Sequence, residues 1–475
     1  MPALFNLQFF GNFSLVAINA LFSIFLIRLL TDEEYGIYGF LVGFLSISLF
    51  LTNFGLSGVV QKRIPTSKDE EKSGIFYSFV LLKIFAQLIF VTILGAYLFH
   101  SDSFNVQLLS FFLVYLFFST LNNFILMTFF IINLQQKSSF YNLIFTSALK
   151  FISLIWVNSF FEISILQIFL ILASAELLSF IISFISWPSL RNIKYPNLKV
   201  YLEAKPFMIT KIFELFFLPS IAIFFLTYFY GFSEVAKFKA IITIALVVIA
   251  NTSLIQRFEF LMINIEKGRL MEQKAITFFK EGIFLVFAAI SISILSFMLI
   301  FPEVISNIFF ANKYSDAVYF LPLISFCVLL NHISYLFSPY IYKENKEHIF
   351  PKATLTGSIV YILSCIILIP NNGFIGAIMA LCLGYVTKPI FFSFLYLKEI
   401  KYLFTKKIAI FMLSWAFCMF FIMWIIKIIN GNIILDITIF LMGFISMLFI
   451  SHYFLLPDNF FKNLKLKFEA VKLNE

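Results

Sequence analysis

The strongest constraint on this chain is a nearly continuous series of apolar stretches, separated only by short polar clusters. A bilayer core of about 30 Å needs around 20 apolar residues per helix, and these stretches have that length. Hydrophobic residues make up 61% of the chain and charged residues 12%, against roughly 25% charged residues in soluble domains. A soluble globular fold is therefore excluded. The sequence predicts an all-α, polytopic membrane protein.

Fourteen membrane spans account for the apolar stretches. We place them at residues 8–30, 36–60, 75–99, 107–133, 140–160, 163–187, 207–230, 236–256, 281–301, 318–342, 352–370, 373–397, 408–429 and 433–456. The first stretch is longer than the core of a signal peptide and no small-residue cleavage site follows it, so we expect a retained span. The connections are too short to form a domain, and function must therefore lie within the membrane.

The positions of the basic residues give an independent test of this topology. Of the 34 Lys and Arg residues, 25 fall in the even-numbered connections and the C-terminal tail, five in or beside the odd-numbered connections, and four within spans. Cytoplasmic loops of membrane proteins carry the excess of Lys and Arg. Both termini are therefore predicted to be cytoplasmic. The net charge of +9 marks membrane edges and gives no reason to expect a nucleic-acid partner.

A short internal repeat divides the chain. Glu34 and Glu234 each follow an apolar span and each precede a small residue at +2 and an aromatic residue at +4. An acid near the start of a helix favours the helix dipole, so both sites are expected to restart a helix. Six spans separate the two copies, and the halves should therefore have the same orientation, as in parallel transporter repeats.

Four segments carry a resemblance to a known family: Arg28–Gly39, Asn53–Gly58, Phe301–Ile305 and Ile369–Ala377. They resemble the polysaccharide-biosynthesis branch of the multidrug/oligosaccharidyl-lipid/polysaccharide exporter superfamily, which includes the O-antigen and capsule repeat-unit flippases. The resemblance implies two six-helix lobes around a central cavity plus a C-terminal helix pair. It also implies movement of an undecaprenyl-pyrophosphate-linked oligosaccharide between the leaflets of the bacterial cytoplasmic (inner) membrane.

The resemblance and the spans together predict a domain plan. The expected parts are an N-lobe at 1–190, a cytoplasmic linker at 191–206, a C-lobe at 207–400, spans 13 and 14 at 401–456, and a basic cytoplasmic tail at 457–475. A polysaccharide polymerase and a chain-length regulator are candidate protein partners, for example in lipopolysaccharide O-antigen synthesis.

Basic residues inside the spans are the candidate substrate contacts. A Lys or Arg at the bilayer centre costs about 2.5–3.5 kcal/mol on insertion scales, so it usually faces a watery cavity or a partner. Lys83 and Lys150 lie roughly 13–15 Å deep, near the midplane. Lys211, Lys388 and Arg28 lie closer to membrane edges. A cationic cavity of these five side chains would compensate a pyrophosphate, for which Lys serves as a point charge.

The acidic residues leave an alternative open. Lys83 or Lys150 could instead pair with Glu176, while Lys211 and Glu214, three residues apart on one helical face, could neutralise each other. Glu176 is the candidate for proton or cation coupling because a desolvated carboxylate takes up a proton more readily. A fixed counter-ion is an equally good interpretation.

The sequence contains no catalytic constellation, so no enzyme activity and no cofactor are expected. Cys327, Cys365, Cys382 and Cys418 lie in apolar runs without the spacing of metal ligands. Two rival functions remain. A cation-coupled drug antiporter of the same superfamily would more usually show twelve spans and a buried acid in the first or seventh, a position where Glu214 lies. A membrane polysaccharide polymerase would be expected to carry a long, Arg-rich external loop.

The topology predicts the outcome of reporter fusions placed after Lys72, Ser101, Lys199 and Lys472. The fusion after Ser101 should report an external location, because it follows an odd number of spans, and the other three should report the cytoplasm. Alkaline phosphatase and fluorescent-protein fusions measure the two locations. An external signal after Lys199 or Lys472 would contradict the predicted span count.

Overall fold

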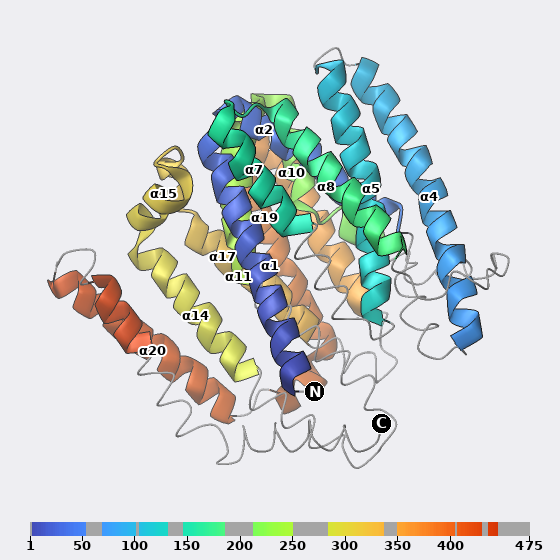
Figure 1. Ribbon diagram of the computed structural model, residues 1–475. Helices are drawn as coiled ribbons and strands as arrows, with labels where there is room; N and C mark the ends of the chain where they lie inside the picture. Colours follow the sequence, from blue (N-terminus) through green and yellow to red (C-terminus); the bar gives the residue numbers. More distant parts are fainter. Residues whose placement is uncertain are drawn as a thin grey trace. The chain divides into compact units, whose positions relative to one another are not determined.

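The computed structural model describes residues 2–53, 69–100, 104–131, 146–185, 212–249, 284–336, 349–403, 406–429 and 436–444. These residues form helices and contain no strand (Figure 1). The helices are α1 (Pro2–Leu29), α2 (Asp32–Leu51), α4 (Asp69–His100), α5 (Val106–Ile131), α7 (Leu149–Phe160), α8 (Ile165–Ile185), α10 (Pro219–Tyr230), α11 (Phe232–Ile249), α14 (Phe284–Ile300), α15 (Pro302–Phe310), α16 (Ser315–Val318), α17 (Leu321–Leu336), α19 (Ile349–Leu403) and α20 (Lys406–Ile429).

The described helices are those of a multi-pass membrane protein. Five of them are long and apolar enough to cross a bilayer, and a sixth span is formed if α14 and α15, which meet at an angle of 93°, are counted together. Their outward side chains are large and apolar, as in Phe85, Ile93 and Phe394, which are 65%, 65% and 73% exposed. Such faces suit lipid and not water. The all-α membrane class is confirmed, whereas the count of fourteen spans stays a prediction.

The restart of the chain at Glu34 has the geometry expected of a helix start. Thr31 is the N-cap of α2: its hydroxyl accepts from the backbone N–H of Glu34 at 3.3 Å. The Glu34 carboxylate in turn accepts from the N–H of Thr31 at 3.1 Å. This capping box satisfies two N–H groups that a helix start leaves unpaired. The local sequence therefore fixes where α2 begins.

The chain packs into two compact units, each taken here by itself. One comprises residues 4–240 and 357–384. In it α5 packs along α8 and α4, and α2 packs on α10. The ring of Phe169 on α8 packs edge-on against Phe112 of α5 at 5.5 Å and near Tyr115 at 6.1 Å.

The other unit comprises residues 1–3, 241–356 and 385–475. Its apolar cluster joins α14, α17 and α20 through residues that include Phe301, Leu329, Trp415 and Met419. The indole N–H of Trp415 donates to the hydroxyl of Ser293 at 3.1 Å, which satisfies a polar group inside the cluster. The predicted lobe boundaries at residues 190 and 207 stay a prediction.

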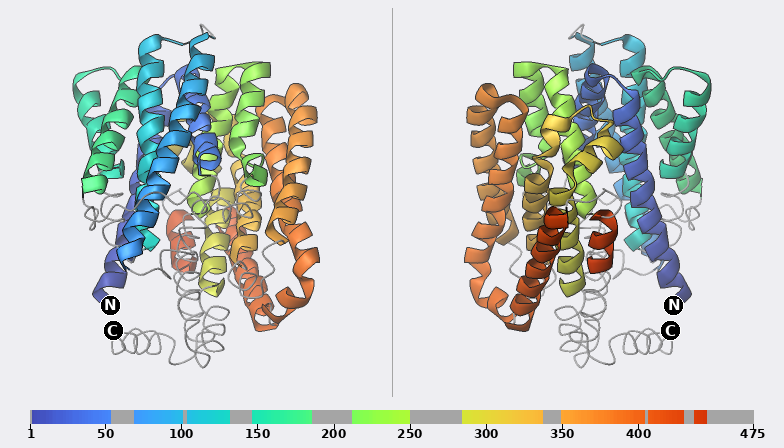
Figure 2. Two further views of the ribbon diagram at one scale, coloured as in Figure 1. Left: turned by 90° about the vertical axis from the view of Figure 1, so that its right-hand side faces the viewer. Right: turned by 90° about the vertical axis from the view of Figure 1, so that its left-hand side faces the viewer.

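Helix α19 is helical over 55 residues but folds back on itself. The rings of Phe350 and Phe392 are 5.5 Å apart, whereas 42 residues of straight helix would separate them by about 63 Å. A Cβ at Gly376 would lie 2.2 Å from the carbonyl oxygen of Leu368, and Gly373 has a φ of +53°. The chain therefore turns at Gly373, and its two arms, orange in Figure 2, correspond to the predicted spans 352–370 and 373–397.

The turn of α19 is fastened to the turn between α10 and α11. The backbone N–H of Phe374 donates to Glu234 Oε2 at 3.0 Å, and the Tyr230 hydroxyl donates to the carbonyl of Pro370 at 2.7 Å. Lys237 donates to Glu234 Oε1 at 2.9 Å. Glu234, which the repeat related to Glu34, thus joins two connections that are 140 residues apart in the chain.

Replacing Gly373 by Ala should destabilise this junction. A non-glycine residue in the left-handed region costs about 1–2 kcal/mol, and the new methyl group would lie 2.9 Å from Glu234 Oε2. Gly231→Ala is the matched control, because its φ is +81° but nothing lies within 4 Å of the added carbon. The thermal midpoint of purified protein should fall further for Gly373→Ala than for Gly231→Ala. Equal losses would contradict the close contact with Glu234.

Candidate functional site

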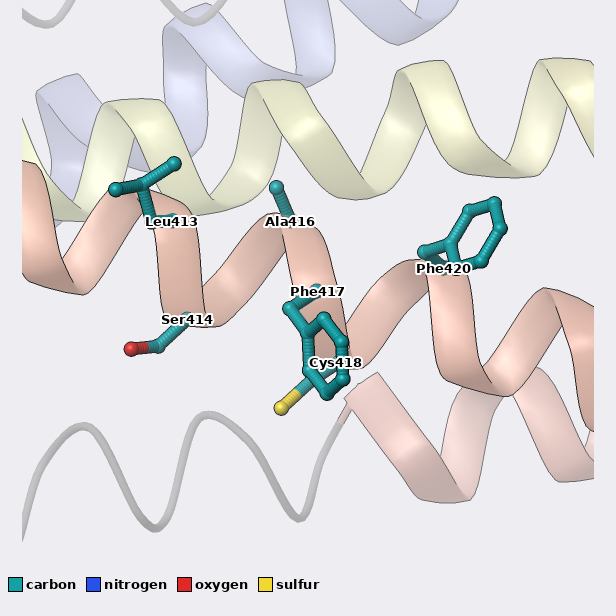
Figure 3. A pocket seen from close by; sticks show the side chains of 6 residues that line it. All are labelled: Leu413, Ser414, Ala416, Phe417, Cys418 and Phe420. Atoms are coloured by element: carbon teal, nitrogen blue, oxygen red, sulfur yellow. The ribbon is translucent and has the colours of Figure 1, made fainter.

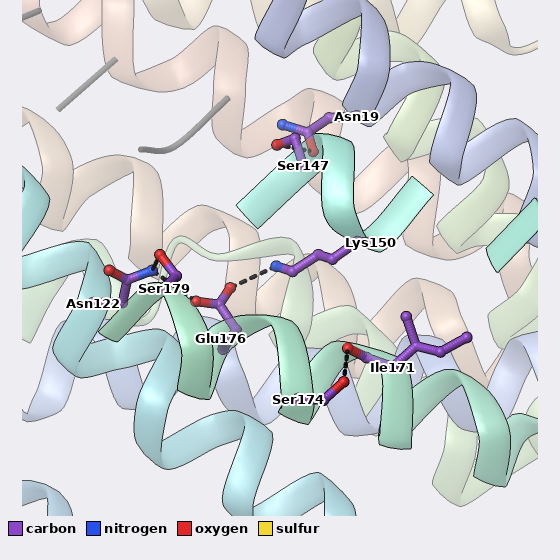
Figure 4. Close-up of polar contacts among 8 residues, drawn as sticks. All are labelled: Asn19, Asn122, Ser147, Lys150, Ile171, Ser174, Glu176 and Ser179. Atoms are coloured by element: carbon purple, nitrogen blue, oxygen red, sulfur yellow. Dashed lines mark hydrogen bonds and ion pairs between the residues drawn. The ribbon is translucent and has the colours of Figure 1, made fainter. Parts of the chain in front are cut away.

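A buried ion pair lies between α7 and α8. Lys150, the second residue of α7, places Nζ 2.5 Å from Oε1 of Glu176 in the middle of α8 (Figure 4). The side chains are only 13% and 5% exposed. Lys150 Nζ also lies 5.7 Å from the centre of the Tyr115 ring. The structure therefore shows Lys150, and not Lys83, as the partner of Glu176.

The second oxygen of Glu176 is held by α5. Asn122 Nδ2 donates to Glu176 Oε2 at 2.9 Å and to the hydroxyl of Ser179 at 2.6 Å. Glu176 and Ser179 are three residues apart and share one face of α8, which is why one amide reaches both. Asn122 is 1% exposed, and its Oδ1 has no hydrogen-bond partner in the described part of the chain.

Burying the Lys150–Glu176 ion pair costs desolvation free energy, so the pair need not stabilise the fold. Taking two charges out of water costs several kcal/mol per ion, and their attraction offsets that cost only when the geometry is good. Removing one partner leaves an uncompensated charge in a low-dielectric interior, which is strongly destabilising. The carboxylate of Glu176 is thus the counter-ion of Lys150 in this conformation.

Lys83 lies on α4 in a different set of contacts. It is 1% exposed and donates to the hydroxyl of Thr52 at 2.6 Å. Thr52 is the C-cap of α2, and its hydroxyl donates to the carbonyl of Ser48 at 2.6 Å. A cation at a helix C-terminus is stabilised by the partial negative charge of the unpaired carbonyls. Lys83 therefore holds the end of α2.

The remaining predicted site residues are not brought into this cluster by any described contact. Lys388 is fully buried on the second arm of α19 and belongs to the other compact unit, at residues 385–475. Arg28 is exposed in the last turn of α1. Glu214 is partly buried just before α10, and Lys211 lies outside the described residues. The predicted neutralisation of Lys211 by Glu214 therefore stays a prediction.

Sequence reasoning missed three polar residues: Asn122 and Ser179 lie beside Glu176, and Lys239 lies on α11 against Gly39. Asn122 and Ser179 escaped notice because single polar residues are common inside apolar runs, although the spacing of Ser179 from Glu176 is a helical-face signal. Lys239 is one of the five basic residues in or beside the odd-numbered connections, because it lies only three residues after the start of the predicted span 236–256. Helix α11 begins at Phe232, so Lys239 lies about two turns inside it.

An apolar depression lies on α20. It is lined by six residues of this helix: Leu413, Ser414, Ala416, Phe417, Cys418 and Phe420 (Figure 3). None of these side chains carries a charge. The depression is a mostly apolar part of the surface of α20.

Comparison with solved structures shows which fold this is. A lipid II flippase, MurJ, in an inward closed conformation matches with a TM-score of 0.67 and 12% identity, over 96% of this chain and 100% of that one. A MOP superfamily transporter from Pyrococcus furiosus matches with a TM-score of 0.61 and 13% identity, over 85% of this chain and 96% of that one. A MATE transporter in the straight conformation matches with a TM-score of 0.59 and 15% identity over 84% and 96%. The fold is that of MOP superfamily transporters.

Sequence comparison gives the family. No curated protein sequence matches this chain. The family model for polysaccharide biosynthesis proteins matches residues 10–255, a range that includes Lys83, Lys150, Glu176 and Lys239. This range covers more than half of the chain and confirms the resemblance seen in its motifs. The chain belongs to the polysaccharide biosynthesis protein family.

Proposed function

We propose that this protein is a flippase, which moves an undecaprenyl-pyrophosphate-linked oligosaccharide across the cytoplasmic membrane for O-antigen, capsule or other surface polysaccharide synthesis. The family membership and the flippase-like fold support transport of a lipid-linked molecule and point to a transporter rather than an enzyme. Transport would proceed by alternating access, with both termini in the cytoplasm.

The observation that carries the proposal is the cation held inside the bundle by Lys150. A membrane protein that needed only stability would gain as much from an apolar pair of the same volume. Lys150 keeps 13% of its side chain exposed and has one carboxylate partner. A pyrophosphate that enters the bundle would compete with Glu176 for Lys150, since phosphate oxygens are equally good acceptors for an ammonium group.

Glu176 has a defined part in this proposal. In the empty protein it neutralises Lys150, and once the cargo has taken Lys150 the carboxylate is free to bind a proton or another cation. Ion coupling through Glu176 or Glu214 would follow from that exchange. The other candidate cations would add positive charge to the translocation pathway in other conformations, because each lies in or at the end of a predicted span. They are Lys83, Lys388, Lys211 and Arg28.

A drug antiporter is the second candidate, because MATE multidrug transporters share the fold. The two functions differ in the charge of the cargo. An exporter of cationic drugs would need a carboxylate available to its substrate, whereas Glu176 is already occupied by Lys150 and Asn122. The family match to polysaccharide biosynthesis proteins also favours the lipid-linked cargo.

Neutralising the ion pair separates its structural role from its transport role. Lys150→Met and Glu176→Gln should each lower the amount of folded protein, because each leaves one buried charge without its partner, a loss of about 3–5 kcal/mol. The double variant should restore the amount of protein, since no charge remains. It should not restore surface polysaccharide if Lys150 binds the cargo.

Quantitative immunoblotting and surface polysaccharide staining measure the two properties. Ser174→Ala is the control: this exposed serine lies two residues before Glu176 on α8, about half a turn away, and its hydroxyl donates to the carbonyl of Ile171 in the same helix. Normal polysaccharide export in the double variant would show that Lys150 is a structural counter-ion and not a substrate contact.

Deleting the gene tests the proposed substrate directly. Loss of a flippase should cause complete lipid-linked repeat units to accumulate on the cytoplasmic leaflet, because synthesis continues while translocation stops. Lipid extraction with mass spectrometry identifies the intermediate, and a glycosidase added to intact or inverted vesicles reports its leaflet. Unpolymerised units on the outer leaflet would indicate a polymerase instead.

A further inference from the structure

Lys239, on α11, is a partly buried lysine whose ammonium group has no partner among the described residues. Lys83 donates to Thr52, Lys150 to Glu176 and Lys237 to Glu234. Lys239, on α11, makes no hydrogen bond and no ion pair within the part of the chain that the structure describes, and it is only partly buried. Its ammonium group therefore differs from those of the other three lysines.

The position of Lys239 makes an unpaired charge costly. It lies seven residues after the start of α11, which is about 10 Å along the helix. Lysines at such depth usually face water or a partner. The nearby acids are engaged elsewhere: Glu234 accepts from Lys237 and Phe374, and Glu34 accepts from Thr31. The natural partner of Lys239 is therefore an anion that the described part of the chain does not supply.

The carbon stem of Lys239 lies against α2 and not against lipid. A Cβ at Gly39 would be 3.1 Å from Cγ and 3.3 Å from Cβ of Lys239, so the glycine lets the stem pack closely against α2. One turn earlier, a Cβ at Gly36 would lie 1.9 Å from the carbonyl oxygen of Phe232. The first turns of α2 and α11 are thus in close contact. The stem of Lys239 packs at this contact, against Gly39.

The internal repeat explains why the two positions differ. Aligning Glu34 with Glu234 pairs Gly39 with Lys239, and the structure places these equivalent residues against each other. Two long side chains cannot fill the same space where equivalent helices meet. One copy of the repeat therefore carries glycine and the other carries the cation.

We propose that Lys239 is an anion contact on the translocation pathway, which binds a phosphate group of the lipid-linked cargo and holds α2 against α11 through its stem when no cargo is bound. This inference rests on the proposed function. Lys150 must release the Glu176 carboxylate before it can bind a phosphate. Lys239 pairs with no carboxylate among the described residues, so it can bind a phosphate directly. A phosphate that draws the ammonium toward itself also pulls the stem away from Gly39. Cargo binding would then loosen the contact between α2 and α11.

Thiol labelling tests whether Lys239 faces the pathway. Lys239→Cys, in a chain whose four cysteines are replaced by Ser, should react with a membrane-impermeant methanethiosulfonate added to inverted vesicles. Undecaprenyl pyrophosphate should reduce the labelling rate about tenfold by occupying the site. Lys352→Cys, at an exposed position at the start of α19, should be labelled without protection. Labelling from outside only would mean that the position faces the outer interface, and no labelling would mean that it is closed to water; either result would overturn the proposal.

Binding to purified protein separates this inference from the proposed function. Undecaprenyl pyrophosphate should bind Lys239→Gln at least about tenfold more weakly than the wild type, because a hydrogen bond to a charged group is lost. Lys239→Arg should bind within about threefold, which excludes a folding defect at this position. If the wild type binds and Lys239→Gln binds equally well, this inference fails alone. If the wild type does not bind, the proposed function fails with it.

Discussion

The structure depends on one constraint: inside a membrane, every charge must find its compensation within the protein or in its cargo. The charge of Lys150 is compensated by Glu176, whose carboxylate also accepts a hydrogen bond from Asn122. Lys83 finds a weaker compensation at the C-terminal end of α2 through Thr52. Each of these contacts joins two different helices. The compensation of charge therefore also determines which helices pack together.

The same constraint explains how far the sequence could predict the molecule. Hydropathy and charge distribution are properties of single segments, and they correctly gave the all-α membrane class. Local chemistry also predicted a helix restart at Glu34, where the structure has a capping box, and a break between spans 352–370 and 373–397, where the structure has the turn at Gly373. The partner of Glu176 could not be decided, because Lys83 and Lys150 have similar depth and only the packing of α7 on α8 selects Lys150.

Lys239 illustrates the other limit of sequence reasoning. Lys239 lies only three residues inside the predicted span 236–256 and is grouped with the residues beside an odd-numbered connection, whereas α11 begins four residues earlier, at Phe232. Its significance comes from Gly39, two hundred positions away, which a single sequence relates to it only through a short repeat. Basic residues near the ends of predicted spans thus need structural placement before they are assigned to topology or to substrate.

The central claim is that the protein moves a lipid with an anionic, sugar-bearing head group between leaflets. A reconstituted transport assay tests it most directly. Proteoliposomes would contain purified protein and a fluorescent undecaprenyl-pyrophosphate-linked oligosaccharide, and a membrane-impermeant quencher would report the leaflet of the probe. The account predicts that the protein speeds redistribution of this probe between leaflets but not of an uncharged polyprenol carrying the same dye. Equal rates with and without protein, or equal acceleration of both probes, would contradict it.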